Sequence, residues 1–132
     1  KAVKLFDYIH SVDSIKVAKK INLCEKEFKK KIKLFIHVNI TGENKKTGIS
    51  LNNLNSFYNF CIKDLSLNVI GLMCIPPLNH NSDKYFKILK EHSKKLNLND
   101  ISIGMSHDYE QAILYGSTYL RIGTAIFGKR SA

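Results

Sequence analysis

The residues best suited to chemistry lie near the end of the chain, in the segment GMSHDYEQAILYGSTYLRIGTAIFG, residues 104–128. The segment holds four of the seven glycines of the chain and one of its two arginines. Ser106 can donate its hydroxyl hydrogen to a phosphate oxygen, and Gly104 allows the backbone to approach a ligand closely. Arg121 can add a charge-assisted hydrogen bond. This combination favours the binding of a phosphate group.

A second set of phosphate donors follows the run YLRIG, which ends at Gly123 and leads into Thr124. If a short helix begins there, its free backbone N–H groups and the Thr124 hydroxyl point to one spot, which the helix dipole makes favourable for an anion. The same glycines can also be ordinary turn residues, and Gly116 is most simply the cap of a preceding helix. The spacing alone leaves both interpretations open.

Five short apolar runs are expected to form the strands that position these residues. Most are too continuously apolar for a sheet with one face in water, which favours buried parallel strands. The predicted strands are DYIHSV (7–12), LFIHVNI (34–40), NVIGLMCI (68–75), DISIGM (100–105) and YLRIG (119–123).

Segments with helical periodicity lie between the predicted strands, and each carries one apolar stripe that fits a buried helical face. The predicted stripes are Val17, Ile21, Cys24 and Phe28; Leu51, Leu54, Phe57 or Tyr58, and Cys61; Tyr85 or Phe86, Leu89, His92 and Leu96; and Tyr109, Ala112 and Ile113. Each helix is preceded by a residue type that caps helix starts. The predicted caps are Ser14 or Asp13, Ser50, Ser82 or Asp83, and Asp108.

Strict alternation of strands and helices predicts an α/β fold with parallel strands joined by right-handed crossovers. An open dinucleotide-binding sheet should carry GxGxxG after its first strand, but the segment VDSIKVA that follows residues 7–12 has no glycine. The alternative is a (β/α)8 TIM-like barrel, which needs about 250 residues. The 132 residues give room for about half a barrel, and the chain begins with Lys rather than Met. We therefore expect residues 1–132 to be a single partial domain, a fragment of a longer protein.

The open ends of such a half-barrel have consequences for its partners. Five parallel strands leave two edges with unpaired backbone groups and an apolar interior that water can reach. We expect a separate or longer chain to supply the remaining strands, or this chain to associate with itself, or to fold poorly alone.

Composition places the chain among globular proteins, with 44% hydrophobic residues. No apolar run approaches the roughly 20 residues that span a bilayer, and KAVKLFDYIH lacks the apolar core of a secretory signal. A cytoplasmic protein without a membrane partner is expected. The three cysteines are odd in number and form no CxxC pair, so they predict reduced core residues rather than disulfides or a zinc ribbon.

The net charge of +10 raises the alternative of nucleic-acid binding. Nearly all of this charge is Lys, and the chain is also rich in Asn and Ile, a combination typical of AT-biased coding sequences. The cluster KKKIKLF, residues 29–35, is dense enough for a weak anion-binding surface, but it contains no arginine. We expect a solvated lysine surface and no nucleic-acid partner.

The segment 104–128 closely resembles the C-terminal signature of the pyridoxal phosphate homeostasis protein family, through the pattern GMSxDxxxAIxxGSTxxRIGTAIFG. These proteins are cytosolic binders of pyridoxal 5′-phosphate (PLP) related to the alanine racemase N-terminal barrel. Three further segments match in the same order: IHSVDSIKVAKKIN (9–22), VNITGENKKTGIS (38–50) and GLMCIP (71–76). The resemblance covers essentially the whole chain and is far more specific than any glycine motif.

The resemblance implies a PLP-binding barrel that buffers the cofactor or delivers it, with apo PLP-dependent enzymes as recipients, and that catalyses no reaction. Matched by position, the phosphate lies against Ser106, Gly123 and Thr124, and Arg121 supports the phosphate or the ring. Asn39 and Met73 match positions that face the cofactor, although from the residues alone Asn39 can equally satisfy backbone groups and Met73 can be plain core.

A further group, Glu43, Lys46 and Gly48, follows a pattern shared with racemase-like barrels. There a basic side chain approaches the cofactor hydroxyl or a substrate carboxylate, whereas a solvated loop lysine is the simpler interpretation here.

The chain departs from the family pattern at the lysine that binds PLP covalently. That lysine ends the first strand of the family barrel, upstream of the region that Lys1 begins, and no equivalent is found in this sequence. Lys33 precedes a strand and Lys16 lies on a predicted helix. The chain thus resembles the last five βα units of the barrel, with the phosphate site but without the covalent anchor.

Two other site chemistries remain as alternatives. A PLP-dependent racemase or decarboxylase needs the anchoring lysine and a second acid or base, which no motif supplies. His10 and His37 could bind a metal from adjacent strands, but a carboxylate or third histidine ligand is not evident, so core or polar-network histidines are expected. His107 follows Ser106, and no motif fixes its role.

Overall fold

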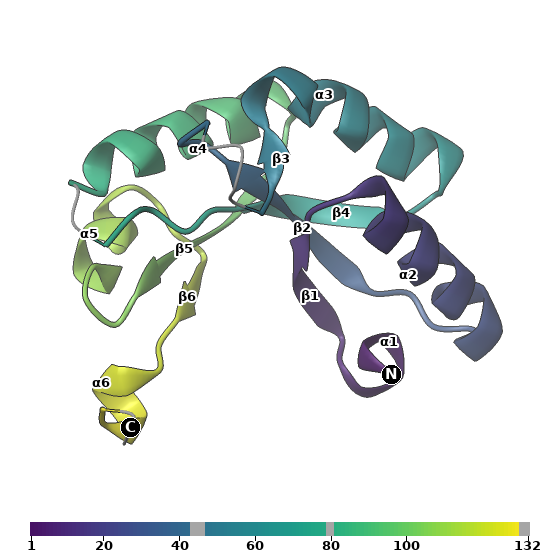
Figure 1. The fold of residues 1–132 in the computed structure, drawn as a ribbon, viewed down its shortest axis with the longest axis horizontal. Helices are drawn as coiled ribbons and strands as arrows, with labels where there is room; N and C mark the ends of the chain where they lie inside the picture. Colours follow the sequence, from purple (N-terminus) through teal and green to yellow (C-terminus); the bar gives the residue numbers. More distant parts are fainter. Residues whose placement is uncertain (43–46, 79–80, 130–132) are drawn as a thin grey trace.

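The chain folds into a curved sheet of parallel strands with helices along its outer side, as the computed structural model of residues 1–42, 47–78 and 81–129 shows (Figure 1). Among the described residues the strands follow the order β1-β2-β4-β5-β6, and the short β3 pairs with β2. Every pairing is parallel. The predicted α/β fold with parallel strands is confirmed, in the form of a half-barrel.

The strands are β1 (Tyr8–Val12), β2 (Lys33–Asn39), β3 (Ile49–Ser50), β4 (Asn68–Met73), β5 (Asp100–Met105) and β6 (Tyr119–Arg121). The helices are α1 (Ala2–Leu5), α2 (Ile15–Phe28), α3 (Leu51–Asn59), α4 (Asp83–Lys95), α5 (Tyr109–Leu114) and α6 (Thr124–Phe127), and α3 continues into the π-helix η1 (Phe60–Asp64). All five predicted strands are confirmed, with ends that differ by up to two residues. The sequence did not predict α1, β3 or η1.

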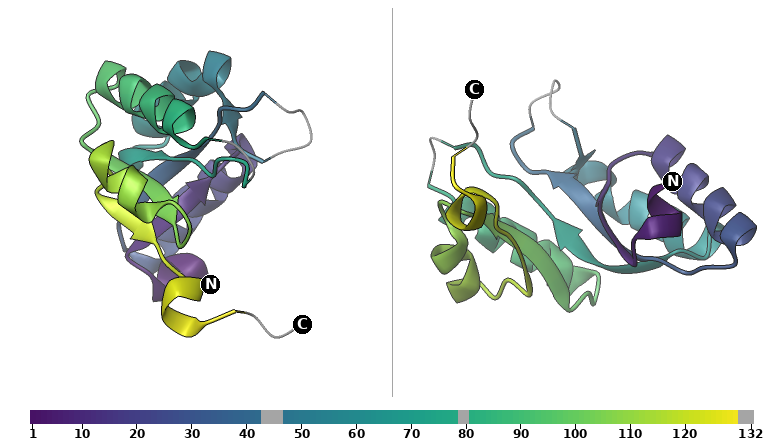
Figure 2. Two further views of the ribbon diagram at one scale, coloured as in Figure 1. Left: turned by 90° about the vertical axis from the view of Figure 1, so that its left-hand side faces the viewer. Right: turned by 90° about the horizontal axis from the view of Figure 1, so that it is seen from below.

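The strands form an arch in Figure 1, with α2, α3, α4 and α5 on its outer side. The short helices α1 and α6 lie at the two feet of the arch, and Figure 2 shows the same arrangement from two further sides. None of the helices in the described ranges has both the length and the apolar character that crossing a bilayer requires.

Alternation along the strands divides the side chains between two faces. On β2, Leu34, Ile36 and Val38 are fully or almost fully buried in the main hydrophobic core, together with residues of the outer helices. The intervening Phe35 and His37 point to the concave side, which we call the inner face. This face carries most of the residues discussed below.

Burial in the outer core largely confirms the apolar stripes predicted for α3 with η1 and for α4. Leu54, Phe57 and Cys61 are buried along α3 and η1, and Phe86 and Leu89 are buried on α4. His92 and Leu96 are only half-buried. On α5 the prediction fails at Ile113, which is 52% exposed, and Ala112 supplies the buried contact.

The predicted stripe of α2 is confirmed at Ile21 and in part at Val17 and Cys24, which pack against the core, and is wrong at Phe28. The buried residues are Ala18, Ile21, Asn22 and Glu25, whereas Val17 and Cys24 are half-buried and Phe28 is exposed. The helix therefore turns a partly polar face toward the sheet.

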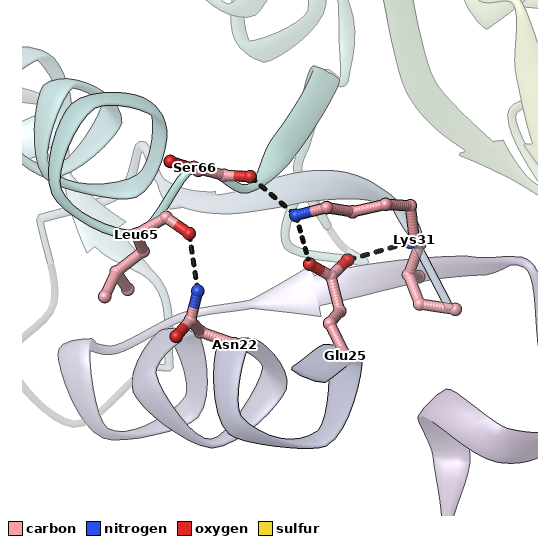
Figure 3. Close-up of polar contacts among 6 residues, drawn as sticks. Asn22, Glu25, Lys31, Leu65 and Ser66 are labelled. Atoms are coloured by element: carbon pink, nitrogen blue, oxygen red, sulfur yellow. Dashed lines mark hydrogen bonds and ion pairs between the residues drawn. The ribbon is translucent and has the colours of Figure 1, made fainter. Parts of the chain in front are cut away.

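Hydrogen bonds explain the burial of the two polar side chains of α2 (Figure 3). The Asn22 amide donates to the Leu65 carbonyl oxygen. The Glu25 carboxylate accepts from the backbone N–H of Ile32 at 2.8 Å and from Lys31 Nζ at 2.9 Å, and Lys31 also donates to the Ser66 carbonyl oxygen. This network joins the end of α2 to the residues that precede β2 and β4.

The predicted caps all occupy helix starts, but they act differently. Ser14 caps α2, because its Oγ accepts the backbone N–H of Val17 at 3.3 Å. Ser50, Ser82 and Asp108 hold the N-cap positions of α3, α4 and α5 without a capping hydrogen bond from their side chains. The side chains of Ser82 and Asp108 instead bond to each other.

Candidate functional site

The predicted site residues gather where the parallel strands end. Asn39 ends β2, Met73 ends β4 and Arg121 ends β6, while Ser106 directly follows β5. Because parallel strands place their carboxyl ends at one edge of the sheet, the four residues lie along the same edge. In α/β proteins this edge is where ligands bind.

Ser106, Gly123 and Thr124 meet at the start of α6. The Ser106 Oγ accepts the backbone N–H groups of Gly123 and Ala125, each at 3.1 Å. Thr124 is the first residue of α6 and is exposed. A Cβ atom added at Gly123 would meet nothing within 4 Å, so the space beside this backbone is open.

An open hollow of about 740 Å³ lies at this point, and Ser106, Arg121, Gly123 and Thr124 all line it. His107 and Lys129 also line the hollow. Hydroxyl, backbone N–H and two cationic side chains therefore face one space, which is the chemistry that a phosphate group requires. The residues present fit such a group.

Arg121 does not point freely into this hollow. Its Nη1 donates to both the carbonyl oxygen and the Oγ of Ser102, at 2.8 and 2.6 Å, and its Nη2 donates to the Cys74 carbonyl oxygen at 2.8 Å. Burial lowers the pKa of the Arg121 guanidinium. Part of the guanidinium is therefore committed to holding β6 against β5 and the end of β4.

Asn39 and Met73 lie apart from the hollow beside Ser106. Asn39 lines a second hollow of about 570 Å³, and its Oδ1 accepts the hydroxyl of Thr41 at 2.9 Å. Leu78 lines both hollows. Met73 is 4% exposed and lies outside the main outer core, in register with His37 of β2 and Ser102 of β5.

Asp108 is a site residue that the sequence analysis assigned only as a helix cap. One carboxylate oxygen accepts the backbone N–H of Met105 at 2.7 Å, and the other accepts the hydroxyl of Ser82 at 2.8 Å. Asp108 thus closes the turn that presents Ser106 and ties it to the segment before α4. Its place two residues after Ser106 in the GMSxD pattern is the signal that could have identified it.

The inner face holds a second polar group, at His10, for which the sequence predicted a core or polar-network histidine without identifying its partners. His10 Nδ1 lies 2.9 Å from Ser102 Oγ, and the His10 ring stacks on Phe35 with centroids 4.2 Å apart. Burial lowers the pKa of His10, and the charge of Arg121 lowers it further. Burial also lowers the pKa of His37, against the opposing effect of Asp13.

The sequence left a metal site at His10 and His37 as an alternative. Within the described part of the chain, no group of three or more His, Cys, Asp or Glu residues is placed to hold a metal ion.

The remaining predicted positions divide between the loop after β2 and the lysines. Glu43 and Lys46 lie outside the described residues. Gly48 has a φ of +115°, and a Cβ there would lie 2.9 Å from Asn39 N, so the position requires glycine. Lys33 begins β2, at the opposite edge of the sheet, and donates to the Tyr8 hydroxyl. Lys16 lies on α2.

Comparison with known proteins identifies relatives over almost the whole chain. Residues 1–131 match the family model described as alanine racemase, N-terminal domain. The pyridoxal phosphate homeostasis protein of Aquifex aeolicus (strain VF5) is 38% identical over 133 residues, which cover 92% of this chain and 58% of the relative. The protein of the same name from Escherichia coli (strain K12) is 32% identical, over 95% of this chain and 57% of the relative.

A solved structure supports the same relationship. PipY of Synechococcus elongatus, determined without PLP, superposes with a TM-score of 0.87 at 29% identity, over 96% of this chain and 63% of PipY. PipY with PLP bound superposes with a TM-score of 0.78. The chain spans less than two thirds of each of these proteins. It belongs to the alanine racemase N-terminal domain family, and the curated relatives named here are pyridoxal phosphate homeostasis proteins.

Proposed function

We propose that this chain binds pyridoxal 5′-phosphate through its phosphate group and takes part in the homeostasis of that cofactor without catalysing a reaction on it. The observation that carries the proposal is the convergence of Ser106, Gly123 and Thr124 on one open hollow, at which the Ser106 Oγ accepts the backbone N–H groups of Gly123 and Ala125. The names of the curated relatives and the PLP-bound structure of PipY support the identity of the ligand.

The correspondence to barrel units, the residues around the ring and the recipients of the cofactor are parts of the same proposal. The five βα units correspond to the C-terminal five units of an eight-stranded barrel, and the phosphate half of the site lies within them. Asn39 and Met73 contribute to the wall around the ring, and apo PLP-dependent enzymes are the recipients of the cofactor. The aldehyde of bound PLP can combine with an amine, and Lys129 is the one lysine among the described residues that line the hollow.

Titration with pyridoxine 5′-phosphate tests the proposal, because this ligand lacks the aldehyde and reports phosphate and ring contacts alone. We expect binding by calorimetry and an upward shift of the thermal unfolding transition, since a ligand that binds only the folded chain stabilises it. Thr124→Ala and Arg121→Lys should each weaken binding about tenfold. Ser56→Ala removes a hydroxyl from the outer helix α3 and should change nothing. A parent chain that folds but does not bind, or site variants that bind as the parent does, would refute the assignment.

The proposal that no lysine of this chain anchors PLP covalently has its own test. Borohydride reduction of the chain with PLP should label several surface lysines weakly, as peptide mass spectrometry would show. A stoichiometric adduct at a single lysine, Lys129 included, would contradict the non-covalent mode.

A further inference from the structure

Side chains from three strands form a continuous hydrogen-bonded chain on the inner face. His10 of β1 lies 2.9 Å from the Oγ of Ser102 on β5, and that oxygen lies 2.6 Å from Arg121 Nη1 on β6. Ser102 is fully buried. The group therefore links a ring on the first strand to the guanidinium beside the proposed ligand site.

The direction of each hydrogen bond follows from the donors available. A guanidinium can only donate, so the Ser102 oxygen accepts from Arg121. If His10 carried its hydrogen on Nδ1, Ser102 would accept twice, and its buried hydroxyl hydrogen would have no acceptor among the described residues. Such an unsatisfied buried donor is costly. The Ser102 hydroxyl therefore donates to His10 Nδ1, and His10 is neutral with its hydrogen on Nε2.

Aromatic rings hold His10 in the orientation that this bond needs. Phe35 of β2 stacks on its ring at 4.2 Å with an interplanar angle of 25°, and Tyr119 of β6 meets it edge-on at 5.5 Å. Tyr8 of β1 lies at 6.5 Å. Apart from Tyr8 and Tyr119, the titratable or charged group that faces His10 from these strands, among the described residues, is Arg121. With its ring fixed between neighbours, His10 presents Nδ1 to Ser102.

At the Arg121 end of this hydrogen-bonded series, part of the guanidinium remains available to a ligand. Three of its N–H groups donate to Ser102 and to the Cys74 carbonyl. No hydrogen bond within the described residues uses its Nε–H or its second Nη2 hydrogen, and no buried side-chain nitrogen there lacks a partner. The Nε–H is therefore accessible, and Arg121 lines the hollow beside Ser106.

We propose that His10 is a positioning residue for ligand binding: by accepting the Ser102 hydroxyl hydrogen it turns the Ser102 oxygen toward Arg121 and fixes the guanidinium so that its unused Nε–H can contact the ligand. The ligand part of this inference rests on the proposed function. His10 itself does not touch the ligand in this arrangement.

Two substitutions of His10 distinguish the role of its hydrogen-bond acceptor from the role of its aromatic ring. Asn places an amide oxygen near the position of Nδ1 and keeps the acceptor, whereas Phe keeps the stacked ring and removes the acceptor. In the full chain, His10→Phe should weaken pyridoxine 5′-phosphate binding about tenfold, and His10→Asn should stay within about threefold of the parent. His92→Phe makes the same chemical change on α4, away from Arg121, and should leave affinity unchanged.

The protonation state of His10 provides a readout that does not depend on the ligand. Two-dimensional ¹H–¹⁵N NMR of the imidazole should show a neutral ring with hydrogen on Nε2. Hydrogen on Nδ1 would contradict the inferred hydrogen bond from the Ser102 hydroxyl to His10. Equal affinities of the parent and His10→Phe, or equal losses in both His10 variants, would overturn the positioning role. A parent chain that does not bind pyridoxine 5′-phosphate would remove the proposed function and the ligand part of this inference, while the NMR result would still decide the hydrogen bonds.

Discussion

The rings of Tyr8 and Tyr119 lie 5.6 Å apart, although their strands, β1 and β6, are the two ends of the sheet. Phe35 also meets Tyr119 edge-on, with centroids 5.0 Å apart. The sheet curves so strongly that side chains from its first and last strands fill the same part of the inner face. This aromatic cluster closes the amino-terminal side of the half-barrel, beneath the level of Arg121.

Gly71 of β4 makes room for the aromatic cluster, because a Cβ there would lie 2.6 Å from Phe35 Cε1 and 2.2 Å from the Asp100 carbonyl oxygen. Backbone cannot move aside as a flexible side chain can. We expect Gly71→Ala to lower the free energy of unfolding by about 3 kcal/mol, measured by urea denaturation. Gly123→Ala, which adds a methyl group in open space, should leave stability within about 0.5 kcal/mol of the parent. Equal stability of the two variants would contradict the packing at Gly71.

The Glu25 carboxylate is the centre of the network in Figure 3, where it accepts hydrogen bonds from Ile32 N and Lys31 Nζ. Glu25→Ala leaves the buried N–H of Ile32 without its acceptor. We expect a loss of about 2 to 3 kcal/mol in unfolding free energy. The exposed Glu27 on the same helix gives the matched control, and Glu27→Ala should cost less than about 0.5 kcal/mol. Comparable losses in both variants would show that the network contributes little.

Asp108 shapes the turn that carries Ser106, so its removal should affect both stability and binding. Asp108→Ala leaves the Met105 N–H and the Ser82 hydroxyl without their acceptor. We expect a loss of about 2 kcal/mol in unfolding free energy, with weaker binding of pyridoxine 5′-phosphate. Ser82→Ala removes only the link to the segment before α4 and should weaken binding less. If Asp108→Ala binds as the parent does, Ser106 does not depend on this turn.

His37 should make stability depend on pH. Burial lowers its pKa from the ordinary value of 6.5, so the unfolded chain binds a proton at higher pH than the folded chain does. The unfolding free energy is therefore greatest above pH 6.5 and falls as the pH drops toward the folded pKa, by at most about 1.4 kcal/mol per pH unit for one histidine. Urea denaturation from about pH 8 to about pH 5 measures the decline. The decline should be shallower in His37→Gln, and an identical slope would exclude His37 as a cause.

The three thiols should differ in reactivity. Burial raises the pKa of Cys61 to about 11 and that of Cys74 to about 12, and the thiolate is the reactive form. Cys24 is half-buried on α2. We expect iodoacetamide at neutral pH to modify Cys24 first, and Cys61 and Cys74 only after unfolding in urea, as peptide mass spectrometry would show. Early labelling of Cys74 in the folded chain would contradict its burial.

The sequence predicts the strands well because most of them are largely apolar runs, and burial on both faces of a parallel sheet requires such runs. It predicts the buried face of α2 only in part. An apolar stripe cannot reveal that Asn22 and Glu25 are buried, since their partners, such as the Leu65 carbonyl and the Ile32 N–H, lie far along the chain or on the backbone.

The site also contains some residues that the sequence could predict and others that it could not. Ser106, Gly123 and Thr124 could be predicted together because each belongs to a contiguous motif at a strand end. The hydrogen bonds of Arg121 could not, because Ser102 and the Cys74 carbonyl are brought to it by the order of strands in the sheet. His10 lies 92 residues from Ser102 along the chain, and no local pattern indicates that contact.

The two hydrogen bonds that Ser106 accepts from Gly123 and Ala125 bear on how strongly an anion can bind. If a phosphate binds here as proposed, its oxygen would compete with the serine oxygen for these two N–H groups, and binding would exchange one acceptor for another while Ser106 changed from acceptor to donor. Removing this hydroxyl would then delete a donor to the ligand and also the internal competitor of the ligand. In the unliganded chain the Ser106 oxygen occupies the acceptor position that the proposal gives to the anion, so the affinity of the proposed site would measure how much better a phosphate oxygen accepts these hydrogen bonds than the serine hydroxyl does.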